Sequence, residues 1–390
     1  MSRAGSQERT LLGLLGCVRP HWRQDSGLPL RIDALLRGDR RLGSRDRRLY
    51  RELLYTALRY LPWVEPLLTA RPGEAARRIA WLATETPSVK PFRDEVAAGL
   101  PPCPIGAEEK AAVLGEVADA LSPAWLRFEC PEACRAPLLD TLLSRAPLWV
   151  RLQGAEQGSA LEEFNRLGWP WRRSPLLPDA VMLPLDADVS KTQAYLAGRV
   201  EVQDVGSQRV LASIGTRPAG HWLDACAGAG GKTLQLASIL GPQGRVTARD
   251  ARPAPLLELR ARATRAGLGP RIEVDGIDPA GGFDGALVDA PCSGSGTWRR
   301  SPHLRWTTTP DGISRAAALQ LRLLLENAPR VRRGGTLVYS TCSLCRSENE
   351  AVVEAFLGRC TGVEVLAQAT RLMADAHDGD GFFVASFRKT

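Results

Sequence analysis

The chain has 390 residues, 44% of them hydrophobic, which is enough for two or three domains with buried cores. No apolar run reaches the roughly 18 residues that a membrane-spanning helix needs, so we expect a cytoplasmic protein without a membrane segment. Nine cysteines are scattered along the chain, and neither their odd number nor their spacing fits a disulfide framework or a zinc site. We therefore predict free thiols and no bound metal.

The formal net charge of +8 is carried largely by the N-terminal region, where residues 1–60 hold thirteen arginines and six acidic residues. The planar guanidinium group of arginine suits phosphate, so RNA or DNA is the expected partner, although a solvated basic surface has the same composition. Apolar residues recur at helical spacing from 44 to 61, with Arg45, Arg48 and Arg51 on other faces. We predict an all-helical, RNA-binding domain over residues 1–140.

Strand-like patterns begin near residue 147. Short alternating runs at 147–152, 180–185 and 198–204, with a helical segment at 160–167, indicate a small mixed α/β module over residues 141–205. Beyond it, helical segments alternate with strand-like runs at 222–226, 245–248, 272–274, 285–288 and 336–339. This alternation predicts a doubly wound α/β domain with a mainly parallel sheet over residues 206–390.

A glycine-rich segment, DACAGAGGKT at 224–233, connects the first of these strands to a helix. Glycines let the backbone approach a ligand closely, and the N–H groups at a helix N-terminus attract negative charge. A nucleoside triphosphate is disfavoured because Cys226 occupies the position of the first glycine of a P-loop. Asp250, at the end of the next strand, offers a carboxylate to ribose hydroxyls. Dinucleotides and S-adenosylmethionine both use such a site, so the loop alone leaves both open.

Two cysteines, Cys292 in DAPC and Cys342 in YSTCS, each follow a short apolar run that we interpret as a buried strand. In an open α/β sheet the strand ends face the ligand crevice, so the two sulfurs can meet over one substrate. Hydride transfer has no need of two thiols. Methylation of carbon 5 of a pyrimidine does need a thiol, because that carbon is a poor nucleophile until a thiolate adds to carbon 6. We therefore favour S-adenosylmethionine.

The segments 224–233, 289–296 and 339–343, with DGDGFF at 378–383, together resemble the motif series of the Sun/Fmu-type RNA cytosine-5 methyltransferases. The resemblance covers most of the chain, since the arginine-rich start is similar to the NusB-like domain of that family and residues 147–205 to its small RNA-binding module. It implies a Rossmann-like class I methyltransferase domain, S-adenosylmethionine as cofactor and small-subunit ribosomal RNA as partner. We expect a monomer.

The resemblance also assigns roles by position. It implies that Asp250 holds the ribose of S-adenosylmethionine, that Asp275 lies near the adenine and that Asp289 binds near the reacting base and also belongs to the cofactor site. Cys342 corresponds to the nucleophile, and Cys292 to the residue that assists product release. The methionine part of the cofactor is assigned to the loop Cys226, Ala227, Gly228, Ala229, Gly230, Gly231 and Lys232.

That loop departs from the family, which usually has Ala-Ala-Pro-Gly-Gly-Lys. The chain has AGAGGK at 227–232, which lacks the rigidity of proline but keeps the glycines. We expect the loop to bind the cofactor nevertheless.

Two alternative functions remain: a transfer RNA cytosine-5 methyltransferase of the same family, and a non-catalytic RNA-binding assembly factor that keeps the fold. The presence of Asp289, Cys292 and Cys342 together favours an enzyme. A DNA cytosine-5 methyltransferase has the Pro-Cys motif but no Thr-Cys partner, so the pair favours RNA.

Basic and aromatic residues interleave just after the first cysteine motif. We expect this segment to contact an unstacked stretch of RNA rather than to form an ordinary surface loop. Its residues are Trp298, Arg299, Arg300, His303, Arg305 and Trp306.

Overall fold

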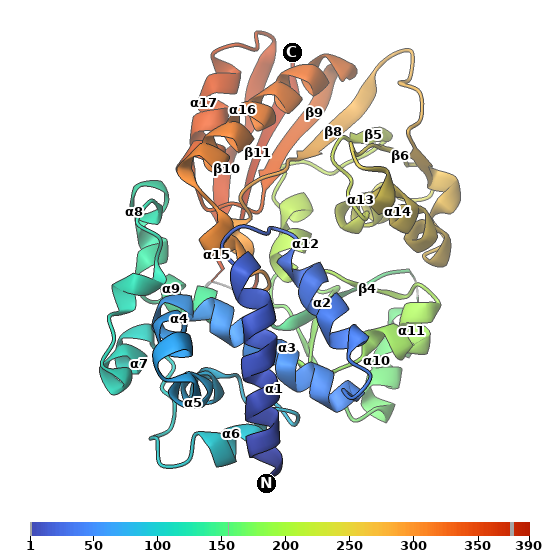
Figure 1. Cartoon of the computed structure of the whole chain (residues 1–390). Coiled ribbons are helices and arrows are strands. Elements are labelled where there is room, and N and C mark those ends of the chain that lie inside the picture. Colours follow the sequence, from blue (N-terminus) through green and yellow to red (C-terminus); the bar gives the residue numbers. More distant parts are fainter. Residues whose placement is uncertain (1, 155, 375–377) are drawn as a thin grey trace. The chain divides into compact units, whose positions relative to one another are not determined.

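The computed structural model describes residues 2–154, 156–374 and 378–390 (Figure 1). Its contacts divide the chain into two units, one made of residues 1–145 and 297–310 and the other of residues 146–296 and 311–390. Within the described ranges, no helix combines the length and apolar character required to cross a membrane.

The first unit is helical. Apolar side chains from its amphipathic helices form one core, which includes the buried Trp22, Trp63 and Trp81. The basic segment that the sequence predicts to be helical from residue 44 is α3, and its apolar face contributes Leu53 and Leu54 to this core. The α-helices of the unit are α1 (Arg3–Val18), α2 (Leu28–Gly38), α3 (Ser44–Arg59), α4 (Leu61–Ala70), α5 (Pro72–Leu82), α6 (Lys90–Val96), α7 (Ala107–Leu114), α8 (Leu126–Glu129), α9 (Leu138–Leu143) and α15 (Leu304–Thr307).

The segment 297–310 belongs to this helical unit, although the sequence placed it in the methyltransferase domain. Trp298 is fully buried and meets Trp125 edge to face, with 6.0 Å between the ring centroids. The guanidinium of Arg305 lies 4.6 Å from the Trp298 ring and donates to the carbonyls of Leu121 at 3.0 Å and Leu142 at 3.5 Å. These side chains anchor the segment in the helical core.

Other members of the same segment have partners in the unit as well. His303 is buried with Nε2 3.0 Å from the Ser26 carbonyl oxygen, and the Trp306 indole N–H donates to the Leu58 carbonyl at 2.6 Å. Arg299 is buried and donates to the Arg145 carbonyl at 3.3 Å. The expectation of RNA contact is therefore wrong for these five side chains, because they are buried or packed inside the unit. Arg300 is half-buried, and its contact with RNA stays a prediction.

The second unit contains two sheets. The smaller sheet has the order β2-β3-β1-β4 with antiparallel pairing throughout, and it belongs to the small module. Its strands are β1 (Leu148–Leu152), β2 (Arg172–Arg173), β3 (Ala180–Leu183) and β4 (Val200–Val202), with α10 (Gln157–Arg166) and α11 (Gln193–Leu196) beside them.

The larger sheet has the order β10-β11-β9-β8-β5-β6-β7. The pairs from β9 through β7 are parallel, and β11 and β10 add an antiparallel edge that the sequence did not predict. The sheet is therefore mainly parallel, as expected. Its strands are β5 (His221–Asp224), β6 (Arg245–Ala248), β7 (Ile272–Val274), β8 (Phe283–Asp289), β9 (Val331–Thr341), β10 (Val363–Leu372) and β11 (Phe382–Lys389).

Helices cover both faces of this sheet (Figure 1). Because side chains alternate along a strand, Trp222 and Val338 pack into one core while their neighbours Leu223 and Leu337 pack into another. The first core includes α12 (Val205–Ala212), α13 (Gly231–Ile239) and α14 (Pro253–Arg265), and the second includes α16 (Pro310–Asn327) and α17 (Glu350–Leu357). Burial on both faces explains why the parallel strands are continuous apolar runs.

We expect Trp298→Ala to lower the free energy of unfolding of the helical unit by about 3–5 kcal/mol, because it leaves a large cavity and removes the aromatic face under Arg305. Urea denaturation followed by far-UV circular dichroism measures this change. Phe128→Ala is the matched control, since Phe128 lies in the same unit and is 86% exposed. An equal, small effect of both substitutions would contradict the anchoring role of the segment.

Candidate active site

The ends of three adjacent parallel strands form the site. In register, Asp224 of β5 pairs with Leu287 of β8, and Asp289 at the end of β8 pairs with Ser340 of β9. The chain continues from β5 to β6 and β7 on one side and then crosses to β8 and β9 on the other, so the strand order reverses between β5 and β8. Crevices at such a reversal are the usual ligand sites of open α/β sheets.

The loop after β5 has a backbone conformation that lets a ligand come close to its main chain. Gly228 and Gly230 have φ values of 51° and 87°, and a Cβ on Gly230 would lie 2.1 Å from Cδ1 of Leu259. By contrast, a Cβ added to Gly228 or Gly231 would meet no atom within 4 Å. Gly230 is therefore required by the backbone and by packing, whereas Gly228 and Gly231 leave room beside the loop.

Asp224 ends β5 beneath this loop and is almost completely buried. Its Oδ2 accepts a hydrogen bond from the Thr233 hydroxyl at 2.7 Å, and its Oδ1 has no partner among the described residues. Burial raises the pKa of Asp224 to about 7, an effect that the Thr233 hydrogen bond opposes. A buried acceptor without a donor beside an open loop fits a ligand that brings a donor.

Lys232 and Asp289 connect the loop to the next strand. The buried Lys232 ammonium donates to Oδ2 of Asp289 at 2.8 Å and lies 4.7 Å from the ring centroid of Phe382. Oδ1 of Asp289 accepts a hydrogen bond from the Ser340 hydroxyl at 2.5 Å. The Asp289 carboxylate is thus fixed on both sides.

Asp250 and Asp275 follow β6 and β7. Both Asp250 oxygens are hydrogen-bonded: Oδ2 accepts from the Gly228 N–H at 2.9 Å, and Oδ1 accepts from the Arg252 N–H and Nε at 2.9 and 3.0 Å. Burial opposes ionisation of Asp250, but these bonds outweigh it and lower its pKa. Asp275 is exposed and has φ 59°. The Arg252 side chain is 70% exposed, so it can leave the carboxylate to another partner.

The two cysteines meet as predicted from their strands. Cys292 Sγ and Cys342 Sγ lie 3.3 Å apart, at hydrogen-bonding distance, and both thiols are free. The hydrogen bond with Cys342, burial and the neighbouring charge of Glu348 together raise the pKa of Cys292 well above its usual value. Cys226 is a third thiol and the first residue of the loop, and burial with nearby carboxylates raises its pKa to about 12.

Glu348 is a site residue that sequence reasoning missed. It is fully buried, and its carboxylate accepts from the Ser293 N–H at 2.8 Å, from the hydroxyls of Ser293 and Ser343, the latter at 2.6 Å, and from Gln320 Nε2 at 3.1 Å. Ser293 and Ser343 directly follow Cys292 and Cys342 in the sequence. One carboxylate therefore joins the two cysteine-bearing loops. The sequence offers no signal for this role, because Glu348 lies in the polar segment RSENE.

The cofactor loop is also tied to the small module. Arg262 of α14 donates through Nη1 to the Ala229 carbonyl at 2.7 Å and through Nη2 to Glu201 of β4 at 2.9 Å. Glu201 is buried and also accepts from Arg265 at 2.6 Å. Arg262 thus fixes the loop at the place where relatives that carry Ala-Ala-Pro-Gly-Gly-Lys have the rigidity of proline.

Among the described residues, no three His, Cys, Asp or Glu side chains cluster in a way that could hold a metal ion. The structure brings together the loop 226–232, Asp289, Cys292 and Cys342 through the contacts above. Asp250 joins them through Gly228, and Asp275 lies at the end of β7, two strands from β5.

A family model described as 16S rRNA methyltransferase RsmB/F matches residues 213–388. The chain belongs to this family. The "Probable ribosomal RNA small subunit methyltransferase B" of Bacillus subtilis is 33% identical over 67% of the chain and 63% of its own length. The chain thus spans slightly less than two thirds of that RsmB/F relative.

Two solved structures share the fold. One, described as PH0851, has a TM-score of 0.75 at 19% identity and covers 100% of both chains. The other, NSun6 from Pyrococcus horikoshii with SFG, has a TM-score of 0.60 at 18% identity and covers 68% of this chain and 96% of that one. A mixed α/β fold with a mainly parallel sheet is therefore common to the RsmB/F chain and these proteins.

The raised pKa of Asp224 predicts a pH dependence of stability. Because the folded state keeps the Asp224 proton up to about pH 7, while an unfolded aspartate loses it near pH 4, this group's contribution to stability declines as pH rises between those values. Asp224→Asn should remove that decline. Urea denaturation at a series of pH values measures the free energy of unfolding of both proteins, and parallel curves would contradict the assignment.

We expect Glu348→Gln to loosen the two cysteine loops, because the amide replaces one acceptor oxygen with a donor. Disulfide formation between Cys292 and Cys342 under diamide should slow about tenfold, the change expected for the loss of one hydrogen bond to a charged group. Mass spectrometry of the oxidised peptides measures the rate. Glu354→Gln is the control, since Glu354 lies exposed on α17 and pairs with Arg346 at 3.2 Å. Equal rates in both variants would contradict the role of Glu348.

Proposed function

We propose that the chain is an S-adenosylmethionine-dependent methyltransferase that methylates carbon 5 of a cytosine in small-subunit ribosomal RNA. The observation that carries this proposal is the pair of free thiols 3.3 Å apart, Cys292 and Cys342, at the strand ends beside Asp289. The names of the relatives support ribosomal RNA as the substrate. The thiol pair supports cytosine carbon 5, because that carbon requires nucleophilic activation.

The residues around the glycine-rich loop fit S-adenosylmethionine. Oδ1 of Asp224 is a buried acceptor for the ammonium group of the methionine part, and the open side of Gly228 and Gly231 leaves room for it. Asp250 offers acceptors to the ribose hydroxyls once Arg252 shares its carboxylate, and we assign the adenine to the vicinity of Asp275. When bound, the cofactor supplies an electrophilic methyl group. The solved structure of NSun6 with SFG supports this assignment.

The proposed reaction begins with Cys342. Its thiolate forms a bond to carbon 6 of the cytosine, and the ring electrons move to carbon 5, which then accepts the methyl group. A base removes the carbon 5 proton, the bond between sulfur and carbon 6 breaks, and the thiolate and the aromatic ring are restored. Asp289, fixed by Lys232 and Ser340, retains a second lone pair on each oxygen and can accept from the exocyclic amino group of the base.

The electrostatics of the thiol pair support the division of roles. Because the hydrogen bond to Cys342, burial and the charge of Glu348 raise its pKa, Cys292 keeps its proton at neutral pH. A protonated Cys292 can donate to the Cys342 sulfur, 3.3 Å away. We therefore assign Cys342 as the nucleophile and Cys292 as the residue that assists release of the methylated product.

We also propose that the helical domain and the small module bind RNA. On α3, Arg45 and Arg48 are exposed, whereas Arg51 pairs with Asp33 at 2.6 Å. Exposed guanidinium groups on the basic N-terminal unit are suited to phosphate contacts. Trp298, Arg299 and Arg305 of the segment 297–310 take no part in this surface because they are buried in the helical unit.

Bisulfite sequencing of total RNA from a strain that lacks the gene tests the substrate. We expect one cytosine of small-subunit ribosomal RNA to lose its methyl group and to regain it on complementation. Loss of the mark from a transfer RNA instead would favour a transfer RNA cytosine-5 methyltransferase, and no change in any RNA would favour a non-catalytic assembly factor.

Substitution of each cysteine separates their roles. Cys342→Ala should form no covalent link to RNA and transfer no methyl group, because the bond to carbon 6 cannot form. Cys292→Ala should form the link, transfer the methyl group once and then stall, giving a slow-migrating protein–RNA band on a denaturing gel. The band should require S-adenosylmethionine. A band with Cys342→Ala and none with Cys292→Ala would mean that the two roles are exchanged.

A further inference from the structure

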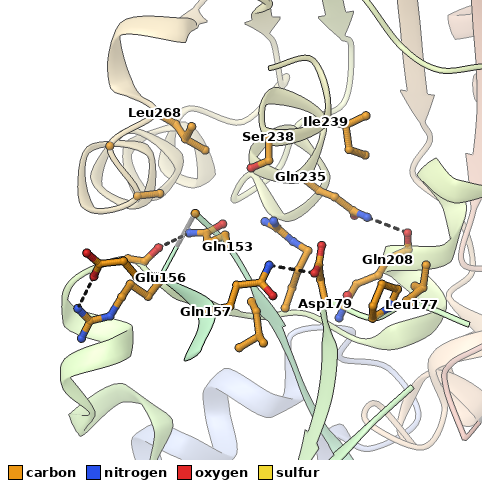
Figure 2. A pocket seen from close by; sticks show the side chains of 18 of the residues that line it. Gln153, Glu156, Gln157, Leu177, Asp179, Gln208, Gln235, Ser238, Ile239 and Leu268 are labelled. Atoms are coloured by element: carbon orange, nitrogen blue, oxygen red, sulfur yellow. Dashed lines mark hydrogen bonds and ion pairs between the residues drawn. The ribbon is translucent and has the colours of Figure 1, made fainter. Parts of the chain in front are cut away.

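A second cavity lies within the second unit, away from the thiol pair. Its volume is about 770 Å³, and its walls come from the small module, from α12 and α13, and from the turn that follows α14. Figure 2 shows the lining side chains. Among the described residues that line it are none of the loop 226–232 and neither Cys292 nor Cys342. The size is within the range of cavities that bind small molecules and cofactors.

Arg151 lines this cavity and forms no direct ion pair with a carboxylate of the described residues. It is buried, its Nε donates to Oε1 of Gln203 at 2.8 Å, and its Nη2 has no partner among the described residues. Its neighbour across the sheet, Glu201, is held by Arg262 and Arg265 instead. Burial lowers the pKa of Arg151 to about 10, which still leaves it charged at neutral pH. The wall therefore holds a buried cation that the charges of Glu201 and Asp179 stabilise from a distance, with no ion pair to it among the described residues.

Gln153 supplies an acceptor to the same wall. Its Nε2 donates to the Gly198 carbonyl at 2.6 Å, whereas its Oε1 is buried without a partner. Arg151 and Gln153 are two residues apart along an extended chain, so their side chains lie on one face of the sheet. An unused cationic donor and an unused acceptor thus face the same region.

Other polar side chains that line the cavity already have hydrogen-bond or ion-pair partners. Gln157 donates to Asp179 at 2.9 Å, Arg199 and Glu156 approach within 3.7 Å, and Gln235 donates to the Gln208 carbonyl at 2.8 Å (Figure 2). Among the described lining residues, the buried side-chain atoms without a hydrogen-bond partner are Nη2 of Arg151, Oε1 of Gln153 and Nε of Arg199. A metal cation would be repelled by Arg151, and an apolar molecule would leave Arg151 and Gln153 unpaired, whereas an anion that also carries a hydrogen-bond donor satisfies both.

We propose that this cavity binds one nucleotide, with a phosphate oxygen or base acceptor opposite Arg151 and a hydroxyl or amino donor to Oε1 of Gln153. A nucleotide is the class of ligand that combines an anionic acceptor with nearby donors at this size. The proposal rests on the proposed function in one respect: in an enzyme that acts on RNA, the nucleotide belongs to the substrate strand. The cavity then fixes a nucleotide other than the one that is methylated.

Two substitutions test the proposal in the full chain. Ser238→Trp fills the cavity from an exposed position near the end of α13, with Ser238→Ala as the matched control, and Gln153→Leu removes the unpaired acceptor. Arg151 is left unchanged because it also holds Gln203 inside the unit. The probes are a short single-stranded RNA of mixed sequence, CMP, AMP and inorganic phosphate, and titration calorimetry at constant salt measures their affinity.

For the RNA, we expect about tenfold weaker binding to Ser238→Trp, several-fold weaker binding to Gln153→Leu and unchanged binding to Ser238→Ala. If CMP or AMP binds the wild-type chain and loses affinity in the same two variants while RNA does not, the ligand is a free nucleotide. Equal affinities of every probe for all four proteins would overturn the proposal, as would binding of inorganic phosphate alone. Equal melting temperatures and S-adenosylmethionine affinities establish that the variants are folded.

The outcome is independent of the methylation test. An enzyme that methylates cytosine but binds RNA equally well with a filled cavity refutes the nucleotide site alone. A chain that transfers no methyl group but loses nucleotide affinity in Ser238→Trp refutes the proposed function alone.

Discussion

The buried carboxylate of Glu348 is the constraint on which the candidate active site depends. Cys292 and Cys342 are carried by loops that leave different strands, and the backbone alone does not fix the distance between their sulfurs. Hydrogen bonds from Ser293 and Ser343 to this one carboxylate join the loops. The fully buried charge is tolerable because several donors, including Gln320, surround it. The sheet therefore brings the cysteines to one edge, and Glu348 brings them to contact.

A second set of charges links the small module to the cofactor loop. Glu201 lies on the small sheet, Arg262 lies on a helix of the large domain, and the Ala229 carbonyl belongs to the loop itself. Because the loop lacks proline, its conformation depends more on such external hydrogen bonds. A movement of the module would therefore also move the guanidinium group of Arg262 and, with it, the cofactor loop.

Much of this arrangement could be predicted from the sequence, because buried parallel strands are apolar runs and their carboxyl ends share an edge. The apolar runs before Cys292 and Cys342 predicted the two strands β8 and β9, and from their shared edge the contact between the two sulfurs could be predicted as well. Glu348 could not be assigned, since a glutamate in a polar segment has the same local pattern whether it is exposed or buried. The antiparallel strand β10 was missed because its side chains are mostly exposed or half-buried and lack a clear alternation. In the segment 297–310, Trp298 and Arg305 were wrongly predicted to contact RNA because the basic and aromatic residues of this segment are typical of an RNA-binding loop. The partners of Arg305, Leu121 and Leu142, lie far earlier in the chain and could not be recognised from the sequence.

The position of that segment also has a consequence for biosynthesis. The helical unit begins at the N-terminus, but its core includes Trp298, which the ribosome adds only after most of the second unit has been made. Domains usually fold in order as they emerge. Here the packing around Trp298 is completed only when the segment between β8 and β9 has been made. A nascent chain that stalls before residue 310 would expose the surface that Trp298 covers. We therefore expect this protein to need chaperones more during translation than the stability of the complete folded chain would indicate.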